Sequence, residues 1–173
     1  LGPTPMLYYA VHHFDAAGGI MVTGSHNPSN YNGFKFMIGK KPFFGKQIQE
    51  LAKIADTADY AEGYGSVEAV NLFPDYVTRI VRDYDAGVST TPLNVAWDPG
   101  NGAGGEVVQQ LANRLPGRHV VINGEIDGTF PAHHPDPTVE ENLKQLKDTV
   151  REQGLDFGIA FDGDADRIGV VDS

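Results

Sequence analysis

The chain has 173 residues with 23 acidic and 13 basic side chains, which gives a formal net charge of −10. This acidic balance argues against a nucleic-acid-binding protein, because such proteins normally present a basic face. The chain contains no cysteine, so disulfides, thiol catalysis and cysteine-based metal sites are excluded.

The N-terminal part of the chain predicts alternating helices and strands. Thr4 and Pro5 can cap and begin a helix, and Pro74 is well placed to open another. Short apolar runs between them predict strands. In chain order we expect a helix from Thr4 whose apolar face reaches Phe14, strands at 19–23 and Phe34–Ile38, a helix at Gln47–Asp56 with Ile48, Leu51 and Ala52 facing inward, a strand at Val67–Leu72, and a helix that begins near Pro74.

The C-terminal part repeats the alternation in a more regular form. Thr138 and Glu141 occupy capping-box positions for the last helix, and Gly154 is its expected stop. The expected elements are a strand at Leu93–Trp97, a helix at Gly104–Leu115, a strand at His119–Ile122, a helix at Val139–Gln153, a strand at Phe157–Phe161 and a return strand at Ile168–Val171.

This alternation predicts the α/β class, because strands separated by helices form mostly parallel sheets with helices on both faces. We expect two three-layer α/β/α domains with mostly parallel mixed sheets. The Gly-rich turn at 63–65 and Pro74 place the boundary near residue 71. The predicted domains are therefore 1–71 and 72–173.

No segment of the sequence predicts a membrane span, since no run of about 18 apolar residues occurs. His12, His13 and Asp15 interrupt the apolar residues near the start, where the basic segment of a signal peptide is also missing. We therefore expect a soluble, cytoplasmic protein with neither a membrane nor a nucleic acid as a partner.

Three carboxylates at every second position form the most informative motif: Asp162, Asp164 and Asp166, followed by Arg167. Unit charges about 4 Å apart repel by roughly 1 to 4 kcal/mol, so a cation is expected among them. Hard oxygen ligands on a Gly-containing turn suit Mg²⁺, and Arg167 would suit a phosphate beside the ion. The alternative is a solvated acidic turn in which Arg167 forms a surface ion pair.

A second motif, Thr23–Pro28, also follows a short apolar run. A Gly-Ser turn at the carboxyl end of a strand places the hydroxyl where open α/β sheets usually hold their active sites. Ser25 is therefore a candidate nucleophile or phosphate carrier, and it needs a base, a metal or a positive environment to react. On these residues alone, an ordinary turn serine fits the motif about equally well.

Two further features favour structural interpretations. The loop at 98–105 is rich in glycine and precedes a helix, but it lacks the spacing of nucleotide-binding motifs. We interpret it as a strand-to-helix turn. His133 and His134 have no third nitrogen donor nearby, so a packed or capping pair is favoured over a metal site.

Together, the motifs resemble those of the α-D-phosphohexomutase family, most closely its bacterial phosphomannomutase/phosphoglucomutase branch. The matching segments occur in order along essentially the whole chain. They are Pro3–Pro5, Thr23–Pro28, Asn32–Lys35, Asp98–Gly102, His133–Pro137 and Asp162–Arg167. The resemblance implies an enzyme that interconverts 1- and 6-phosphosugars, with mannose and glucose phosphates as the favoured substrates.

The resemblance also implies roles for single residues. Ser25 resembles the family phosphoserine, which exchanges its phosphoryl group with the sugar; glucose 1,6-bisphosphate is then an activator or intermediate. Asp162, Asp164 and Asp166 resemble the three protein ligands of Mg²⁺, with a phosphoserine oxygen completing the inner shell. Lys35 resembles a family lysine that acts in general acid-base catalysis, a role that requires burial and nearby cations to lower its pKa. His26 is implied to act in catalysis beside the phosphate, and Asn27 and Arg167 are implied to bind the phosphate.

The resemblance further implies that the first domain is incomplete and that other domains are missing. The family's third domain, with a sugar-selecting loop, and its fourth, with a phosphate-binding loop, have no counterpart in the sequence. We therefore expect these domains and a hexose phosphate as partners, and no turnover by this chain alone. Two alternatives remain, namely a non-catalytic metal- and phosphate-binding module and a metal-dependent phosphatase with a serine nucleophile.

Overall fold

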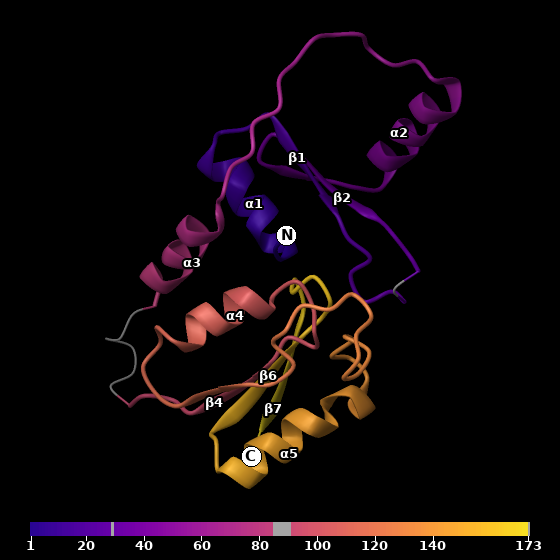
Figure 1. Ribbon diagram of the computed structural model, residues 1–173. Coiled ribbons are helices and arrows are strands. Elements are labelled where there is room, and N and C mark those ends of the chain that lie inside the picture. The colour runs from indigo at the N-terminus through magenta and orange to yellow at the C-terminus, as the bar shows by residue number, and fades with distance from the viewer. Residues whose placement is uncertain (29, 85–90, 173) are drawn as a thin grey trace.

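The computed structural model describes residues 1–28, 30–84 and 91–172, which form two α/β units (Figure 1). The first unit consists of α1 (Thr4–His13), β1 (Gly18–Val22), β2 (Phe34–Ile38), β3 (Lys41–Phe43) and α2 (Lys46–Thr57). The second consists of α3 (Phe73–Arg82), β4 (Val95–Asp98), α4 (Gly105–Ala112), β5 (His119–Val121), the 3₁₀ helix η1 (Glu140–Leu143), α5 (Lys144–Gln153), β6 (Phe157–Phe161) and β7 (Ile168–Asp172). Within the described ranges, no helix is long and apolar enough to cross a membrane.

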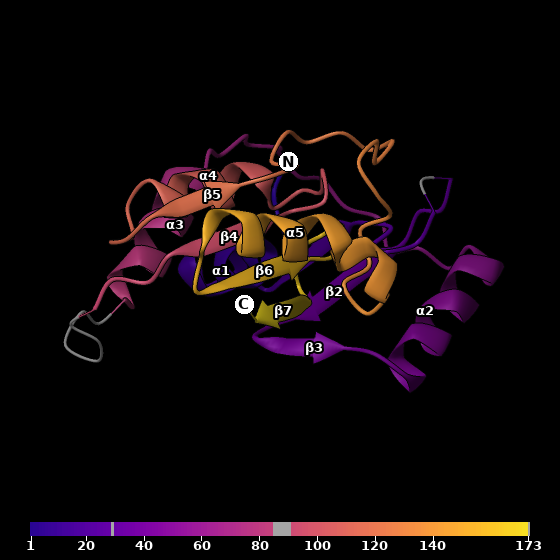
Figure 2. The ribbon, with the colours of Figure 1, turned by 90° about the horizontal axis from the view of Figure 1, so that it is seen from below.

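The sheet of the second unit has the strand order β5-β4-β6-β7. Strand β4 pairs in parallel with β5 and β6, while β7 returns antiparallel to β6. Leu146 and Val150 of α5 pack against Ala96 and Ala160 on one face of this sheet, and α4 lies over the other face (Figures 1 and 2). The predicted α/β class and the mostly parallel order are confirmed here.

The sheet of the first unit is antiparallel in all its described pairings, which differs from the mostly parallel order that we predict. Ile20 of β1 faces Phe36 of β2, and Phe36 in turn faces Phe43 of β3. A parallel neighbour needs a crossover of about a dozen residues or more. Only Gly39 and Lys40 separate β2 from β3, so β3 must return antiparallel.

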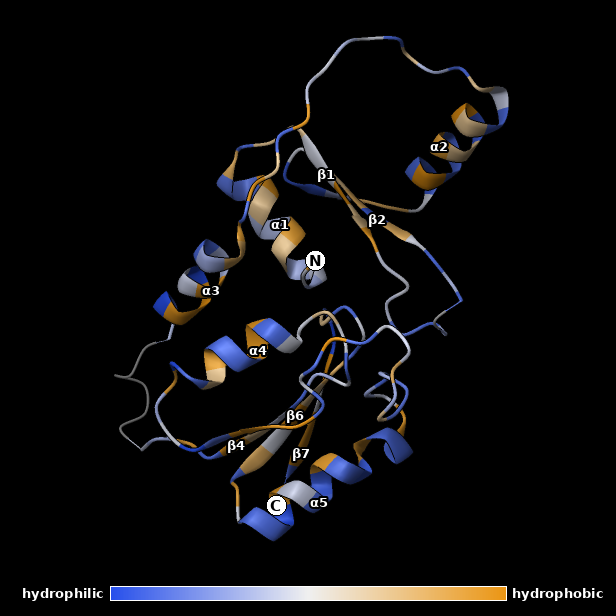
Figure 3. Ribbon diagram, in the orientation of Figure 1, coloured by the Kyte–Doolittle hydropathy of each residue, from blue (hydrophilic) through white to orange (hydrophobic). Residues whose placement is uncertain are grey.

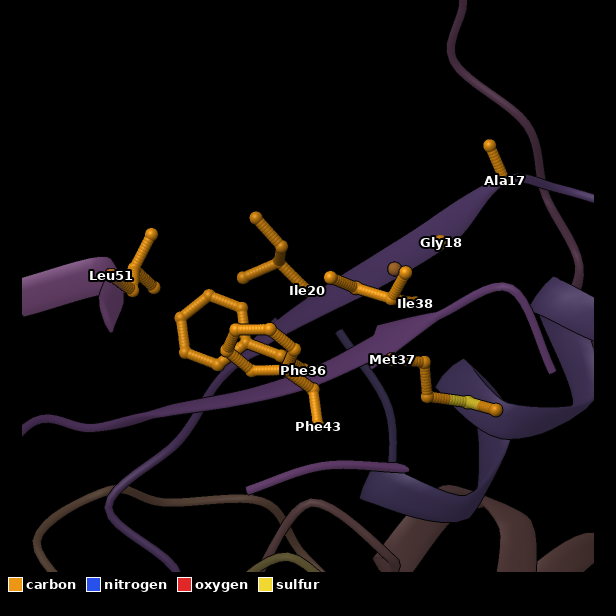
Figure 4. Close-up of a pocket in the computed structure, with 9 residues that line it drawn as sticks. Ala17, Gly18, Ile20, Phe36, Met37, Ile38, Phe43 and Leu51 are labelled. Atoms are coloured by element: carbon orange, nitrogen blue, oxygen red, sulfur yellow. The ribbon is translucent and has the colours of Figure 1, made fainter. Parts of the chain in front are cut away.

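One face of this first sheet is apolar and exposed. Helix α1 covers the opposite face and buries Val11. Ile20, Val22, Phe34 and Ile38 are each 59–63% exposed, and the hydropathy colours show apolar residues along β1 and β2 (Figure 3). The residues that line an open groove on this face include Ile20, Phe36, Ile38 and Phe43, with Leu51 of α2 at one end (Figure 4).

Helix α2 forms where the sequence predicts it, but the prediction that its apolar side faces inward is wrong. The helix has no buried residue, and Leu51 and Ile54 are 38% and 44% exposed. Gly45 has a φ of +61°, a left-handed conformation that favours glycine, and turns the chain away from the sheet just before α2 begins. Helix α2 therefore lies to one side of the sheet (Figure 1), and its Leu51 lines one end of the apolar groove.

Two other predictions are corrected. The segment Val67–Leu72 forms no strand and pairs with no strand in the described ranges, and Val67 is fully exposed. The predicted capping box at Thr138 is also absent, because the Thr138 hydroxyl donates to Asp136 Oδ1 at 2.7 Å. A side chain occupied by this local turn cannot cap the helix. Gly154 ends α5 in the left-handed conformation, as predicted.

Candidate active site

The carboxylates of Asp162, Asp164 and Asp166 lie on the turn that connects β6 to β7. Asp162 and Asp164 are 0% and 3% exposed, whereas Asp166 is exposed. One oxygen from each carboxylate lies within 4.8 Å of the other two. Converging oxygen donors of this kind have the chemistry that a hard divalent cation requires.

The turn that carries Ser25 meets this acidic turn, although 137 residues separate Ser25 from Asp162. Ser25 Oγ lies 2.9 Å from Asp162 Oδ2 and 3.1 Å from Asp164 Oδ1. At Gly163 an added Cβ would lie 2.3 Å from the Ser25 carbonyl oxygen, so the close approach needs glycine there. Ser25 itself has a φ of +51°, a strained conformation typical of functional turns. The predicted meeting of the two motifs is confirmed.

Arg167 connects the serine turn to the acidic turn. Its Nη2 donates to Ser25 Oγ at 2.7 Å, and its Nε donates to Asp162 Oδ2 at 3.1 Å. The same Nη2 contacts Nδ1 of His26. A guanidinium is therefore in place beside the Ser25 hydroxyl, where an anionic group on that oxygen would be stabilised.

Lys35 of β2 provides a second cation. Its Nζ lies 2.7 Å from Asp164 Oδ2 and also pairs with Asp166. Burial lowers the pKa of Lys35, but the hydrogen bonds to Asp164 and Asp166 outweigh burial and raise the pKa above its usual value. The lowered pKa that the sequence analysis set as a condition for catalysis by Lys35 is therefore not found in this arrangement, because the nearest charges are anionic.

The two buried carboxylates have opposite pKa shifts. Burial raises the pKa of Asp162 above its ordinary value. Burial acts on the pKa of Asp164 in the same direction, but the hydrogen bonds that Asp164 accepts from Lys35, Thr4 and Thr23 outweigh it and lower this pKa. Asp164 is thus held ionised by its neighbours, ready to act as a ligand.

Sequence reasoning missed the positions of Thr4 and Thr23 in this site. Thr4 Oγ1 donates to Asp164 Oδ2 at 2.6 Å, and Thr23 Oγ1 donates to the same oxygen at 2.9 Å. Both threonines lie within motifs that match the family, Pro3–Pro5 and Thr23–Pro28. Their presence in these motifs could have marked the two threonines as candidate site residues. Nothing in the sequence, however, predicts that Thr4 contacts a carboxylate 160 residues away.

Asn27 differs from the other predicted site residues in its position. It lies on the exposed side of the serine turn, and its backbone N–H donates to the carbonyl oxygen of Gly24 at 2.9 Å. The structure therefore groups Ser25, His26 and Lys35 with the acidic turn and leaves the Asn27 side chain in solvent.

Family models match both units of the chain. The model described as phosphoglucomutase/phosphomannomutase, alpha/beta/alpha domain I, matches residues 1–62, and the corresponding domain II model matches residues 74–173. The chain belongs to the phosphoglucomutase/phosphomannomutase family. Both family models describe α/β/α domains, in agreement with the predicted fold class.

Relatives of the phosphoglucomutase/phosphomannomutase family match nearly the whole chain. Phosphomannomutase/phosphoglucomutase of Pseudomonas aeruginosa PAO1 is 44% identical over 169 residues, which are 98% of this chain and 36% of the relative. Phosphoglucomutase of Neisseria meningitidis serogroup B strain MC58 is 41% identical over 170 residues, which are 97% of this chain and 36% of the relative.

A solved structure supports the same relationship. A phosphoglucomutase/phosphomannomutase family protein from Burkholderia thailandensis superimposes with a TM-score of 0.90 at 39% identity. The match covers 99% of this chain and 39% of that protein. The chain therefore spans 36% of the length of the two curated relatives and 39% of this solved chain.

The structural interpretation of the histidine pair holds for His133, which packs against the end of β4, whereas His134 is exposed. His133 Nε2 lies 2.9 Å from Oδ2 of Asp98, which is fully buried, and His133 Nδ1 lies 3.0 Å from the carbonyl oxygen of His134. The hydrogen bond to Asp98 is the main reason why the pKa of His133 is raised. Both ring nitrogens face acceptors, so the protonated imidazole is favoured.

We expect His133→Asn to destabilise the chain most at low pH, by about 2 kcal/mol, the scale of a hydrogen bond to a charged group. Because the folded-state pKa is raised, the stabilisation is complete below the ordinary pKa of histidine, near 6.5, and is lost as pH rises through the raised value. Urea unfolding of both proteins between pH 5.5 and 9 measures this difference. His134→Asn, at an exposed position, is the control. A stability difference independent of pH would contradict the expectation.

Proposed function

We propose that this chain is the phosphoserine- and metal-bearing part of an enzyme that interconverts hexose 1-phosphates and hexose 6-phosphates. The observation that carries this proposal is the position of Ser25 Oγ, within hydrogen-bonding distance of two buried carboxylates and of Arg167. Relatives named phosphomannomutase/phosphoglucomutase support mannose and glucose phosphates as the substrates.

In this proposal Ser25 carries the phosphoryl group that is exchanged with the sugar. A serine hydroxyl is a weak nucleophile unless its surroundings are positive or basic. Arg167, which donates to Ser25 Oγ, and His26, which contacts Arg167, then hold oxygens of the phosphate. Asn27 contributes to phosphate binding from the exposed side of the same turn.

The residues present fit Mg²⁺, because the site offers three converging carboxylates and no softer donor within the described cluster. Asp162, Asp164 and Asp166 would hold the ion together with an oxygen of phosphorylated Ser25. A bound Mg²⁺ supplies neutralisation of the charge on the phosphoryl group during transfer. Glucose 1,6-bisphosphate is the proposed activator or intermediate, since it can return a phosphoryl group to Ser25.

Lys35 acts in this proposal as the general acid. Its raised pKa keeps the ammonium protonated at neutral pH, so Lys35 can donate a proton to a sugar oxygen when the bond from that oxygen to phosphorus breaks. In the opposite direction, the attacking sugar hydroxyl gives its proton to the neutral amine of Lys35 as its oxygen bonds to phosphorus and the bond from phosphorus to Ser25 Oγ breaks. The contacts with Asp164 and Asp166 restrict where the Lys35 ammonium can move.

Further domains complete the proposed enzyme. The net charge of −10 disfavours an anionic sugar phosphate, and Arg167 and Lys35 offset this charge only locally. We propose that a longer polypeptide, the parent protein, contains a third domain that selects the sugar and a fourth that binds the distal phosphate. The boundary near residue 71 and the cytoplasmic location stay predictions within this proposal.

The proposed function is tested by incubating the parent protein with glucose 1-phosphate, Mg²⁺ and a trace of glucose 1,6-bisphosphate. Glucose 6-phosphate is followed by a coupled dehydrogenase, and inorganic phosphate is measured in parallel. Formation of the 6-phosphate without release of phosphate is the expected result. Stoichiometric phosphate release would instead identify a phosphatase, and metal binding without either product would identify a non-catalytic module.

A further inference from the structure

The two oxygens of Asp164 have different surroundings. Oδ2 accepts hydrogen bonds from Thr4 Oγ1 at 2.6 Å, Thr23 Oγ1 at 2.9 Å and Lys35 Nζ at 2.7 Å. Oδ1 faces only Ser25 Oγ, at 3.1 Å, among the side-chain contacts recorded within the described ranges. A carboxylate oxygen offers about two lone-pair directions, so Oδ2 is fully used while Oδ1 keeps the capacity to bind a cation.

The two threonine hydroxyls are themselves fixed in place. Thr4 is fully buried at the start of α1, and its backbone N–H donates to the carbonyl oxygen of Asp164 at 2.8 Å. Thr23 Oγ1 accepts from the backbone N–H of Ser25 at 2.8 Å while it donates to Asp164. Turning the Thr4 hydroxyl away from Asp164 would leave a buried hydroxyl without its acceptor, and turning the Thr23 hydroxyl away would also disturb its contact with the Ser25 N–H. The Asp164 carboxylate is therefore held in one orientation.

We propose that Thr4 and Thr23 restrict Asp164 to binding a metal through Oδ1 alone, and that they thereby make the site select a small six-coordinate cation over Ca²⁺. This inference takes one assumption from the proposed function, namely that the three aspartates bind a divalent cation. Mg²⁺ requires near-octahedral coordination, whereas Ca²⁺ accepts six to eight oxygens and often binds carboxylates through both of them. A carboxylate whose second oxygen is occupied cannot provide the extra ligand that Ca²⁺ uses.

The test replaces each hydroxyl by a methyl group of the same size. Thr4→Val, Thr23→Val and the double variant of the parent protein remove the hydrogen bonds, while Thr4→Ser and Thr23→Ser keep them. The dissociation constants of Mg²⁺ and Ca²⁺ are measured by titration calorimetry without any sugar phosphate. This readout does not depend on turnover, and circular dichroism of each variant checks that it is folded.

We expect the ratio of the Ca²⁺ to the Mg²⁺ dissociation constant to fall about tenfold or more in the double valine variant, which is the range over which outer-shell partners change metal binding. The two serine variants should keep the ratio of the unaltered protein. If Thr4→Val does not fold, Thr23→Val alone should lower the ratio, since Thr23 is only half-buried.

Equal changes in both dissociation constants, or an unchanged ratio in a folded valine variant, would overturn the inference. A lowered ratio in a protein without mutase activity would support the inference and contradict the proposed function. Mutase activity together with an unchanged ratio would support the proposed function and contradict the inference. Failure of the unaltered protein to bind either ion would overturn both the inference and the metal part of the proposed function.

Discussion

Ser25→Ala in the parent protein should lower mutase turnover by at least about a thousandfold, since loss of a catalytic nucleophile can cost on the order of a millionfold. The variant removes the oxygen that would carry the phosphoryl group, and no other hydroxyl takes its place beside Arg167 among the contacts of the described residues. The coupled assay for glucose 6-phosphate measures the rate. Mass spectrometry of the protein after incubation with glucose 1,6-bisphosphate should show an added phosphoryl group only when Ser25 is present.

The fold should survive this substitution. Arg167 keeps its contact with Asp162 at 3.1 Å, and Asp164 keeps Thr4 and Thr23, so only the bonds of one hydroxyl are lost. Ser66→Ala, at an exposed position in the segment before α3, is the matched control and should leave the rate unchanged. A Ser25→Ala protein that keeps near-normal turnover would show that Ser25 is not the phosphoryl carrier.

The 173-residue chain alone should show no detectable conversion of glucose 1-phosphate to the 6-phosphate. Positioning of the reactants can account for roughly 7 to 11 kcal/mol of an enzyme's lowering of a barrier. The chain spans 36% of the length of its curated relatives, and we propose that the sugar-binding groups lie in the rest. The rate is measured on the purified chain after its intact mass has been verified.

The parent protein prepared in the same way is the positive control for this experiment. Calorimetric titration of the chain with Mg²⁺ checks that the acidic turn is formed, so that inactivity is not a result of misfolding. Turnover by the chain within tenfold of the parent protein's rate would refute the expectation. It would mean that the two units described here bind and reorient the sugar phosphate unaided.

Elements with a strong apolar pattern and a partner in the fold could be predicted from the sequence. Strands β2 and β6 begin and end where the sequence predicts. The failed strand at Val67–Leu72 pairs with no strand in the described ranges, and a strand is stabilised by its cross-strand contacts. Strand β3 was missed because it has only three residues and contains Pro42, which cannot donate a backbone hydrogen bond.

The candidate site was predictable in its parts but not in its contacts. Ser25 and Asp162 both follow strands, but only the resemblance to the family implied that the two turns share one site. The sign of the pKa shift of Lys35 could not be predicted, because it depends on Asp164 and Asp166 lying closer than any cation. The role of Thr4 could not be predicted either, because its contact with Asp164 forms only when the two units come together.

The contacts between the two units have a thermodynamic consequence. Thr4 binds Asp164, Ser25 contacts Asp162, and Lys35 pairs with the acidic turn, so this part of the interface consists of the groups that would hold the ligands. Any ligand that strengthens these contacts favours the arrangement in which the two units are in contact. By reciprocity, separating the units must lower the affinity for that ligand by the same factor. Ligand binding and association of the two units would then be linked, so that the occupancy of the site determines how firmly the units are held together.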